Sequence, residues 1–182
     1  MESIASSLLK LEERSQGFRI ENLLKNELFQ STLLNATVVA VRNHQKEKRE
    51  ALRNAVLNTA LQTAADEDLQ LMFLAFIDVF TPTHLRILRF FDDPQRWAQE
   101  HNLTYPNSSF GPPSAALQLA FPELAREFYD AVVKDLADRG LIHGNVQVGM
   151  TASAMISSRT TTMGKRFLIF ISSPIQDADL TK

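Results

Sequence analysis

The sequence predicts a mainly α-helical protein with one small antiparallel β-hairpin. Two observations predict the helices: none of the six glycines and seven prolines falls within Phe18–Thr81, and apolar residues recur there at helical spacing. One observation predicts the hairpin, because apolar and polar residues alternate in VQVGM, residues 146–150, after a glycine that would end a helix. A chain of 182 residues is long enough to bury a sizeable core.

The first helices are expected before residue 66. Ile20, Leu24, Leu28 and Leu34 follow helical spacing, and the polar stretch RNHQKEKRE, residues 42–50, then interrupts the pattern. This region is therefore either one long helix or two helices with a break near His44. We predict a first domain of residues 1–65, a helical hairpin or dimerisation arm, and a second domain of residues 66–182.

Capping residues and prolines mark the ends of the next two helices. Asp66 is a suitable N-cap for the stretch that ends in LMFLAFIDVF, which is apolar almost all round and is predicted to lie at the centre of the core. Thr81 and Pro82 suit the start of the following helix, Pro82–Asp92, and Pro94 follows its end.

The second half of the chain is predicted to contain shorter elements. Residues 94–113 read as a proline-rich loop with room for a short helix around Trp97. A short helix over Ser114–Phe121 and a longer one over Glu123–Arg139 follow, the second ended by Gly140. The buried side of the longer helix is expected to be formed by Leu124, Phe128, Ala131, Val132 and Leu136.

The end of the chain resembles a winged-helix domain. The segment LADRGLI, residues 136–142, is similar to a recognition helix running into the first wing strand, and TTTMGKRFLIFI, residues 160–171, is similar to the closing motif of such domains. The resemblance covers Thr81–Ile171 and implies strands at Val146–Met150 and Ile156–Thr161. It also implies a threonine cap, a close approach at Gly164, and a return to the core by Phe167, Leu168, Phe170 and Ile171.

The whole chain also resembles uncharacterised bacterial proteins that are loosely similar to the alpha-type abortive-infection family. The helical first half with EKREALRNAV, the segment TPTHLRILRFFDDP and the winged-helix-like ending carry this resemblance. It implies no particular activity, because the biochemistry of that family is poorly defined.

The charge pattern bears on nucleic-acid binding. Net charge is −2, and Glu123–Arg139 has five acidic residues against three basic ones, which disfavours DNA contact through that helix. The strongest basic cluster contains Glu47 and Glu50, so a solvated helix face is an alternative to a phosphate site. The candidate residues for nucleic-acid or phosphate contact are Arg42, Lys46, Lys48, Arg49, Arg53, Arg159, Lys165 and Arg166.

No motif points to catalysis. The four histidines are scattered without metal-ligand spacing, and there is no G-x-S-x-G or G-x-G-x-x-G sequence. The absence of cysteine removes disulfides and thiolate chemistry. We therefore expect no enzyme, no metal and no cofactor. The longest apolar run, Leu71–Ile77, is too short to span a membrane, so a cytoplasmic protein is expected.

The resulting functional hypothesis is a non-enzymatic interaction or regulatory protein of a bacterial cytoplasm, built on a winged-helix-like domain. Its partner is expected to be a second copy or another protein. The alternative is a DNA-binding transcriptional regulator, and an enzyme of an unrecognised kind is a third hypothesis. The dimer contacts are expected at Ile20, Leu24, Leu28 and Leu34. The competing arrangement has the helix Leu69–Phe80 cover this surface within one chain.

Overall fold

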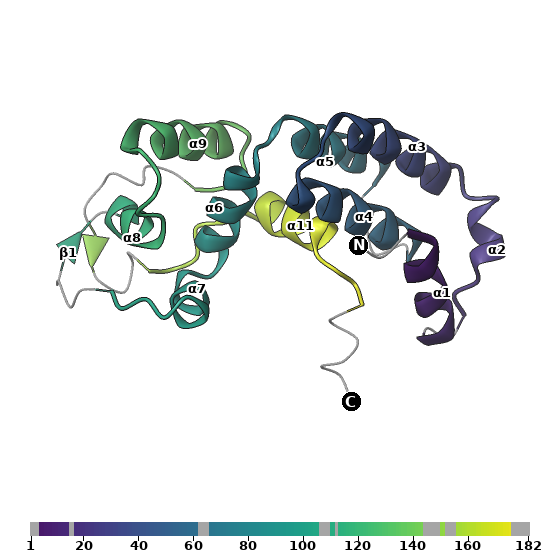
Figure 1. The fold of residues 1–182 in the computed structure, drawn as a ribbon, viewed down its shortest axis with the longest axis horizontal. Coiled ribbons are helices and arrows are strands. Elements are labelled where there is room, and N and C mark those ends of the chain that lie inside the picture. The colour runs from purple at the N-terminus through teal and green to yellow at the C-terminus, as the bar shows by residue number, and fades with distance from the viewer. Residues whose placement is uncertain are drawn as a thin grey trace. The chain divides into compact units, whose positions relative to one another are not determined.

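A computed structural model describes residues 4–14, 17–61, 66–105, 110–111, 113–143, 150–151 and 156–175. The protein is mainly α-helical, as predicted (Figure 1). It divides into two compact units, one of residues 1–81 with 167–182 and one of residues 82–166. The predicted boundary at residue 65 differs from this division, because the helix that follows it packs with the helices that precede it.

In its described residues, the first unit contains five helices and half of a sixth (Figure 1). Its last element comes from the end of the chain: Phe167–Ile171, the second half of α11 (Thr162–Ile171), belongs to this unit. The other elements are α1 (Ile4–Arg14), α2 (Ile20–Leu23), α3 (Glu27–Arg42), α4 (Lys46–Ala60) and α5 (Glu67–Val79).

Local signals set the helix ends in this unit. The Asn26 side chain accepts a hydrogen bond from the Phe29 backbone N–H at 3.0 Å, and Asp66 accepts one from Leu69 at 3.1 Å. The chain leaves helical geometry at 43–45, so that of the two predicted alternatives the structure shows two helices with a break near His44 and not one long helix. The N-cap role of Asp66 is also confirmed.

Phenylalanines form the core where α5 meets α11. Phe73 and Phe167 have no exposed surface, and their ring centroids lie 5.2 Å apart in an edge-on arrangement. Phe76 and Phe80 also contact the Phe167 ring edge-on. The predicted return of Phe167, Leu168, Phe170 and Ile171 to the core is confirmed, since each is at most 7% exposed.

Two asparagines of α4 hold the end of α11. The Asn58 side-chain amide donates to the carbonyl oxygens of Ile169, Phe170 and Ser172 at 2.9–3.1 Å. Asn54 donates to the Ile171 carbonyl at 2.9 Å. The last carbonyls of a helix have no partner within the helix, so these buried amides satisfy groups that would otherwise be left unpaired.

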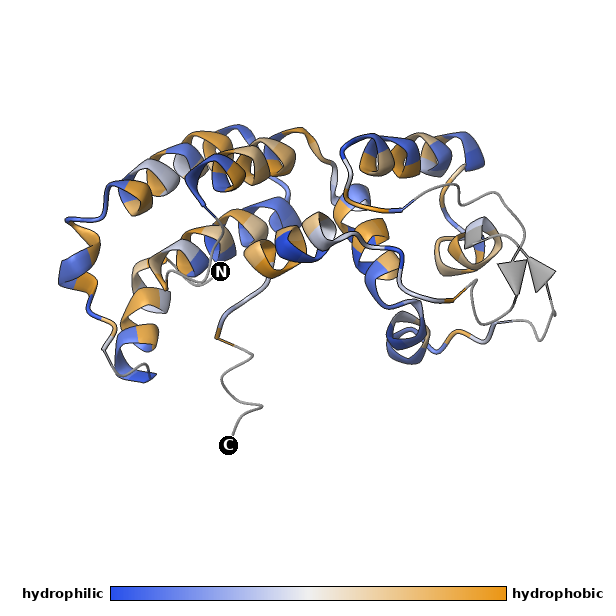
Figure 2. Ribbon diagram, turned by 180° about the vertical axis from the view of Figure 1, so that it is seen from behind, coloured by the Kyte–Doolittle hydropathy of each residue, from blue (hydrophilic) through white to orange (hydrophobic). Residues whose placement is uncertain are grey.

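The second unit contains α6 (Pro82–Asp92), α7 (Pro94–Glu100), α8 (Pro113–Ala120), α9 (Arg126–Asp138) and the first half of α11. The bounds of α6 confirm the prediction. Its core contains Phe90, Trp97 and Phe121, whose rings lie 5.2–6.2 Å apart. Figure 2 shows hydrophobic and hydrophilic residues alternating along the helices of each unit, as expected of helices with one buried side.

The winged-helix prediction is wrong. The only strands among the described residues are β1 (Phe110–Gly111) and β2 (Met150–Thr151), which pair antiparallel with each other. Residues 146–149 lie outside the described residues, and Ile156–Thr161 contributes only a single bridge, between Thr160 and Ile142. The described residues therefore contain no wing hairpin after α9.

Several local features of the predicted closing motif are nevertheless present. Thr161 accepts a hydrogen bond from the Gly164 N–H at 2.9 Å and so caps α11. Gly140 ends α9 with a φ of +72°, and the Leu141 N–H bonds back to the Leu136 carbonyl at 2.9 Å. These residues act in the predicted way within a different topology.

The buried side of α9 matches the prediction only in part. Val132 and Leu136 are buried as expected, and Tyr129 and Val133 are buried too, whereas Phe128 is 43% exposed and Ala131 is exposed. The helix begins at Arg126 rather than Glu123, because Pro122–Leu124 form turns. In the described parts of the chain no single helix is long and apolar enough to cross a membrane, although α5 and α6 taken together meet the length and composition of a span.

Candidate functional site

Helix α3 has an apolar stripe on its solvent side. Leu34 is 66% exposed, Val38 50% and Val41 83%. Their spacing of four and then three residues places them on one side of the helix. The opposite side packs into the unit through Phe29, Ala36 and Val39. α3 therefore has two apolar sides, one of which is largely exposed among the described residues.

Helix α5 repeats this pattern. Leu71 is 39% exposed and Val79 56% exposed, and Ala75 between them is also exposed. The spacing of four residues aligns all three along one side of the helix. The sequence predicted that α5 lies at the centre of the core. That prediction holds for the side with Phe73 and Ile77, which is buried, and is wrong for the side with Leu71, Ala75 and Val79, which is exposed.

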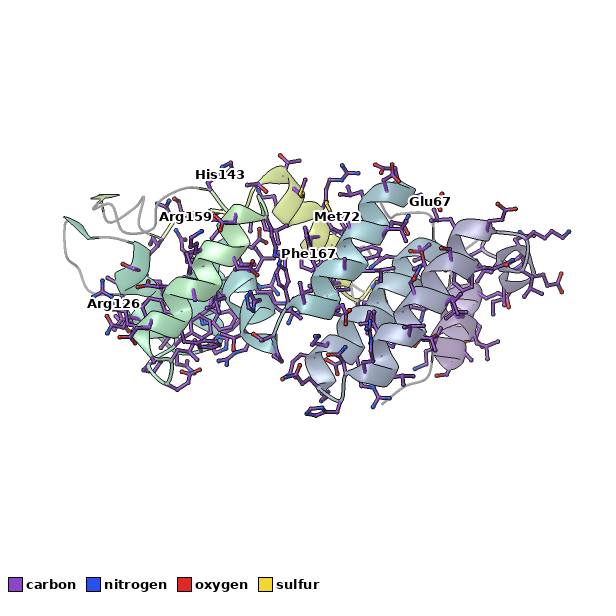
Figure 3. All side chains as sticks on the ribbon, turned by 90° about the horizontal axis from the view of Figure 1, so that it is seen from above. Glu67, Met72, Arg126, His143, Arg159 and Phe167 are labelled. Atoms are coloured by element: carbon purple, nitrogen blue, oxygen red, sulfur yellow. The ribbon has the colours of Figure 1, made fainter. Side chains whose placement is uncertain are left out.

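The two stripes lie on neighbouring, parallel helices. Near the first turns of α5, the hydroxyl of Thr32 lies 3.4 Å from the side-chain oxygen of Gln70. Near the C-terminal ends, the guanidinium of Arg42 donates to Asp78 at 2.8 Å. Contacts that join like ends show that the helices run in the same direction, side by side (Figure 3). We call the exposed residues Leu34, Val38, Val41, Leu71, Ala75 and Val79 the α3–α5 face.

A buried polar contact holds the helices beneath this face. Gln70 is 2% exposed, and its side-chain oxygen lies 2.7 Å from the Thr59 hydroxyl of α4. The Thr32 hydroxyl of α3 approaches the same oxygen. Three helices thus meet at one amide, which fixes the relative level of α3 and α5 because buried polar groups need their partners.

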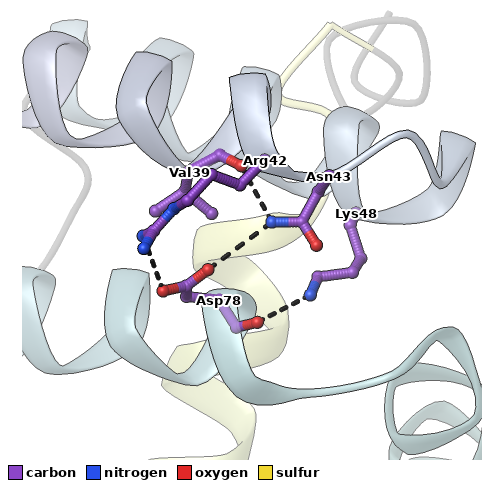
Figure 4. A network of polar contacts seen from close by, with 5 residues as sticks. All are labelled: Val39, Arg42, Asn43, Lys48 and Asp78. Atoms are coloured by element: carbon purple, nitrogen blue, oxygen red, sulfur yellow. Dashed lines mark hydrogen bonds and ion pairs between the residues drawn. The ribbon is translucent and has the colours of Figure 1, made fainter.

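A second set of polar contacts links the C-terminal ends of α3 and α5 (Figure 4). The Asn43 amide donates to the Val39 carbonyl at 2.8 Å and to the Asp78 carboxylate at 3.5 Å, and the Lys48 ammonium of α4 donates to the Asp78 backbone carbonyl at 2.7 Å. Burial lowers the pKa of Lys48 by disfavouring the charged form, and the nearby Asp78 carboxylate partly opposes that shift. These contacts bind the loop after α3 to the end of α5.

Charged residues differ at the two ends of the face. At the N-terminal ends of α3 and α5, Glu27, Glu67 and Asp68 are exposed carboxylates. At the other end Asp78 pairs with Arg42, and the cations Lys46 and Arg49 that follow alternate with Glu47 and Glu50. Lys25, just before α3, is an exposed cation at the N-terminal end, which is therefore acidic on balance, whereas charges of both signs lie at the C-terminal end.

The structure places two of the predicted dimer contacts in solvent. Leu24 is 78% exposed and Leu34 66% exposed, while Ile20 and Leu28 are half-buried. The competing arrangement, in which α5 covers all of this surface, therefore does not hold for Leu24 and Leu34. Dimerisation itself stays a prediction.

Most of the basic cluster of the first unit has structural partners. Arg42 pairs with Asp78, and Lys46 lies 3.8 Å from Glu50. Lys48 is 4% exposed and bonded to a carbonyl, so it is not positioned to meet a phosphate. Arg53 bonds to its neighbour Asn54 at 3.2 Å. Arg49 is exposed.

The remaining basic candidates lie in the second unit. Arg159 is half-buried, and burial lowers its pKa. Lys165 and Arg166 are exposed in α11. Arg42–Arg53 belong to the first unit and Arg159–Arg166 to the second. A single basic surface formed by both groups stays a prediction.

Helix α9 does not resemble a DNA-reading helix in its charges. Its acidic residues lie beside cations one turn away, with Arg126 near Asp130 at 3.6 Å and Arg139 near Asp135 at 2.9 Å. Lys134 likewise pairs with Asp138. Such pairs leave few cations for phosphates.

Sequence reasoning missed most of the α3–α5 face. Of the six residues of this face, only Leu34 is among the predicted contacts. The signal that finds the others is a second apolar stripe on a helix that already has one. No group of three or more histidine, aspartate or glutamate residues in the described ranges could hold a metal ion.

Comparisons of the chain with known protein families, with curated proteins and with solved structures found no match. The predicted resemblances to winged-helix domains and to the alpha-type abortive-infection family are therefore wrong.

Proposed function

We propose that the chain is a non-enzymatic interaction protein that uses the α3–α5 face to bind a protein partner, in the first place a second copy of itself. One observation carries the proposal. Five large apolar side chains with exposures of 39–83% lie on two adjacent parallel helices of one unit. Contiguous apolar surface of this kind marks interaction sites in soluble domains.

Free energy favours covering this face. Apolar surface left in water costs about 25 cal/mol per Å² relative to burial. The inner sides of α3 and α5 are already filled by their own unit, through residues such as Val39 and Phe73. The outer stripes can therefore be covered only from outside the unit's own core.

The polar side chains beneath the face support an interaction role rather than a chemical one. Lys48 and Gln70 are each buried and bonded to backbone or side-chain groups within the unit. They fix the helices that carry the face. The DNA-binding alternative gains no comparable support, since Arg42, Lys46 and Lys48 of the basic cluster have partners within their own unit.

A site-specific photo-crosslinker tests the proposal. A benzophenone amino acid replaces Val38 in living cells, and the matched control replaces the exposed Glu100 of the second unit. We expect adducts from position 38 and none from position 100. An adduct of twice the chain mass identifies a second copy. The proposal fails if position 38 gives no more adduct than position 100.

A further inference from the structure

We propose that two copies pack their α3–α5 faces about a two-fold axis in antiparallel orientation, with α3 against α3 and α5 against α5. This inference rests on the proposed function, because it concerns the same face. It adds the direction of the partner helices and the residues that meet.

Two face-to-face arrangements are open to identical copies. A homodimer interface uses the same patch twice about a two-fold axis. If the axis runs along the helices, the copies are parallel, and α3 lies against the α5 of the other copy. If the axis runs across the helices, the copies are antiparallel, and each helix lies against its own equivalent.

The charges select the antiparallel arrangement. Parallel packing would bring the acidic ends together, with Glu27, Glu67 and Asp68 of both copies at one end. Like charges brought together at an interface are destabilising. Antiparallel packing instead places each acidic end beside the other copy's loop after α3 and the first turn of α4, where the cations Lys46 and Arg49 alternate with Glu47 and Glu50, so that two acidic ends do not meet.

The apolar residues also match in this orientation. The Arg42–Asp78 pair fixes how α3 is positioned along α5, and it places Val38 at nearly the same height along the helix axes as Ala75. An axis passing there brings Leu71 against the second copy's Val79, at nearly equal distances of about 6 Å along the helix from the axis. Ala75 lies at the axis, where a small side chain lets two helices approach closely.

The size of the face fits a moderate affinity. Helices of 13 and 16 residues are about 20 and 24 Å long, and neighbouring helices pack about 8–10 Å apart. The face would bury on the order of 1,200 Å² across both copies, the lower end of the range for specific interfaces. We therefore expect a dimer that forms at micromolar concentrations.

Single cysteines test the orientation, because the natural chain has none. The variants are Leu71→Cys, Val79→Cys and Leu34→Cys, all at exposed positions, with the exposed Glu100→Cys as the collision control. Mixtures are oxidised, and the disulfide-linked dimers are identified by mass. Thermal unfolding of each reduced variant checks that it folds like the natural chain.

The antiparallel dimer predicts one pattern. A disulfide needs Cα atoms within about 7 Å, whereas Leu71 and its own equivalent would lie about 12 Å apart along the helix. The mixture of Leu71→Cys and Val79→Cys should therefore give about tenfold more cross-linked dimer than either variant alone. Glu100→Cys should give only the background level.

Other outcomes separate this inference from the proposed function. Cross-linking of Leu71→Cys with Leu34→Cys would show the parallel arrangement and would overturn the inference alone. If the photo-crosslinker at position 38 attached to a different protein instead of a second copy, that result would also overturn the inference alone. Absence of both disulfides and photo-adducts would overturn the inference and the proposed function together.

Discussion

Gly164 lies so close to Leu141 that a β-carbon at Gly164 would stand 2.1 Å from the Leu141 carbonyl oxygen. Real β-carbons do not approach a backbone atom this closely, so either α11 or residue 141 would have to move. The contact lies where α11 begins, one turn from the Thr161 cap. It leads to the first prediction.

Gly164→Ala is expected to destabilise the protein by about 1–3 kcal/mol, the usual cost of forcing extra volume into a packed site. Helix propensity alone would favour alanine by up to about 1 kcal/mol, so the sign of the effect tests the contact. Lys165→Ala is the control, because Lys165 is an exposed neighbour in the same helix. Urea denaturation measures both, and a stabilised Gly164→Ala protein would contradict the observed packing.

Asn58→Ala is expected to cost about 1–3 kcal/mol, because it leaves buried carbonyl groups at the end of α11 without their donor. The control is Asn35→Ala. Asn35 is exposed and bonds only to the preceding turn of its own helix, so its loss should stay within about 0.5 kcal/mol. Chemical denaturation of the two variants compares them. Equal losses would show that the Asn58 contacts do not stabilise the last helix.

Phe167→Ala is expected to destabilise the protein by about 3–5 kcal/mol, since it removes a fully buried ring between Phe73, Phe76 and Phe80. Ile169→Ala, two residues away and 61% exposed, should have an effect within about 0.5 kcal/mol. Calorimetry can measure the difference. A small effect at Phe167 would contradict its place in the core of the first unit.

The lowered pKa of Lys48 predicts a pH dependence. The usual pKa of a lysine is near 10.5, and the pKa of Lys48 in the folded chain is lower. At pH values between these two, Lys48 holds its proton more firmly in the unfolded chain than in the folded chain, so the free energy of unfolding rises with pH. Lys48→Met removes this contribution. Thermal unfolding from about pH 8 to about pH 10 should therefore show the natural chain gaining stability relative to the variant.

Lys46→Met is the matched control, because Lys46 is 78% exposed. The difference between this variant and the natural chain should stay constant across the same pH range. If Lys48→Met behaved in the same way, burial would not be shifting the Lys48 pKa.

Helix ends could be predicted from the sequence because they depend on neighbouring residues. The cap at Asp66, the start at Pro82 and the stop at Gly140 each depend on bonds that span only a few residues. The break near His44 follows from a polar stretch that interrupts an apolar pattern. These features require no knowledge of which helix lies beside which.

The topology could not be predicted in the same way. The roles of Thr161, Gly164 and Phe167 were foreseen, yet the winged-helix arrangement inferred from them was wrong. A capped helix with a close glycine contact can follow many kinds of chain path. Phe167 packs against α5, which is far away in the sequence, and no local pattern specifies that partner.

The α3–α5 face was only partly predicted. Leu34 was assigned to it, but α5 was read as buried because it is apolar almost all round. The composition of a helix gives the number of its apolar residues, but it does not show how many sides of the helix are covered by neighbouring helices. Leu71 and Val79 remain exposed because α3 and α4 occupy only the inner side of α5.

The first unit takes its last core element from residues 167–171, after the whole of the second unit. A ribosome synthesises the chain from its N-terminus, so residues 82–166 emerge before Phe167 can reach Phe73. Until then, the rings that Phe167 covers are open to water, and Asn54 and Asn58 lack their carbonyl partners. The nascent chain therefore passes through a stage with exposed core, when chaperones can bind it and aggregation competes with folding.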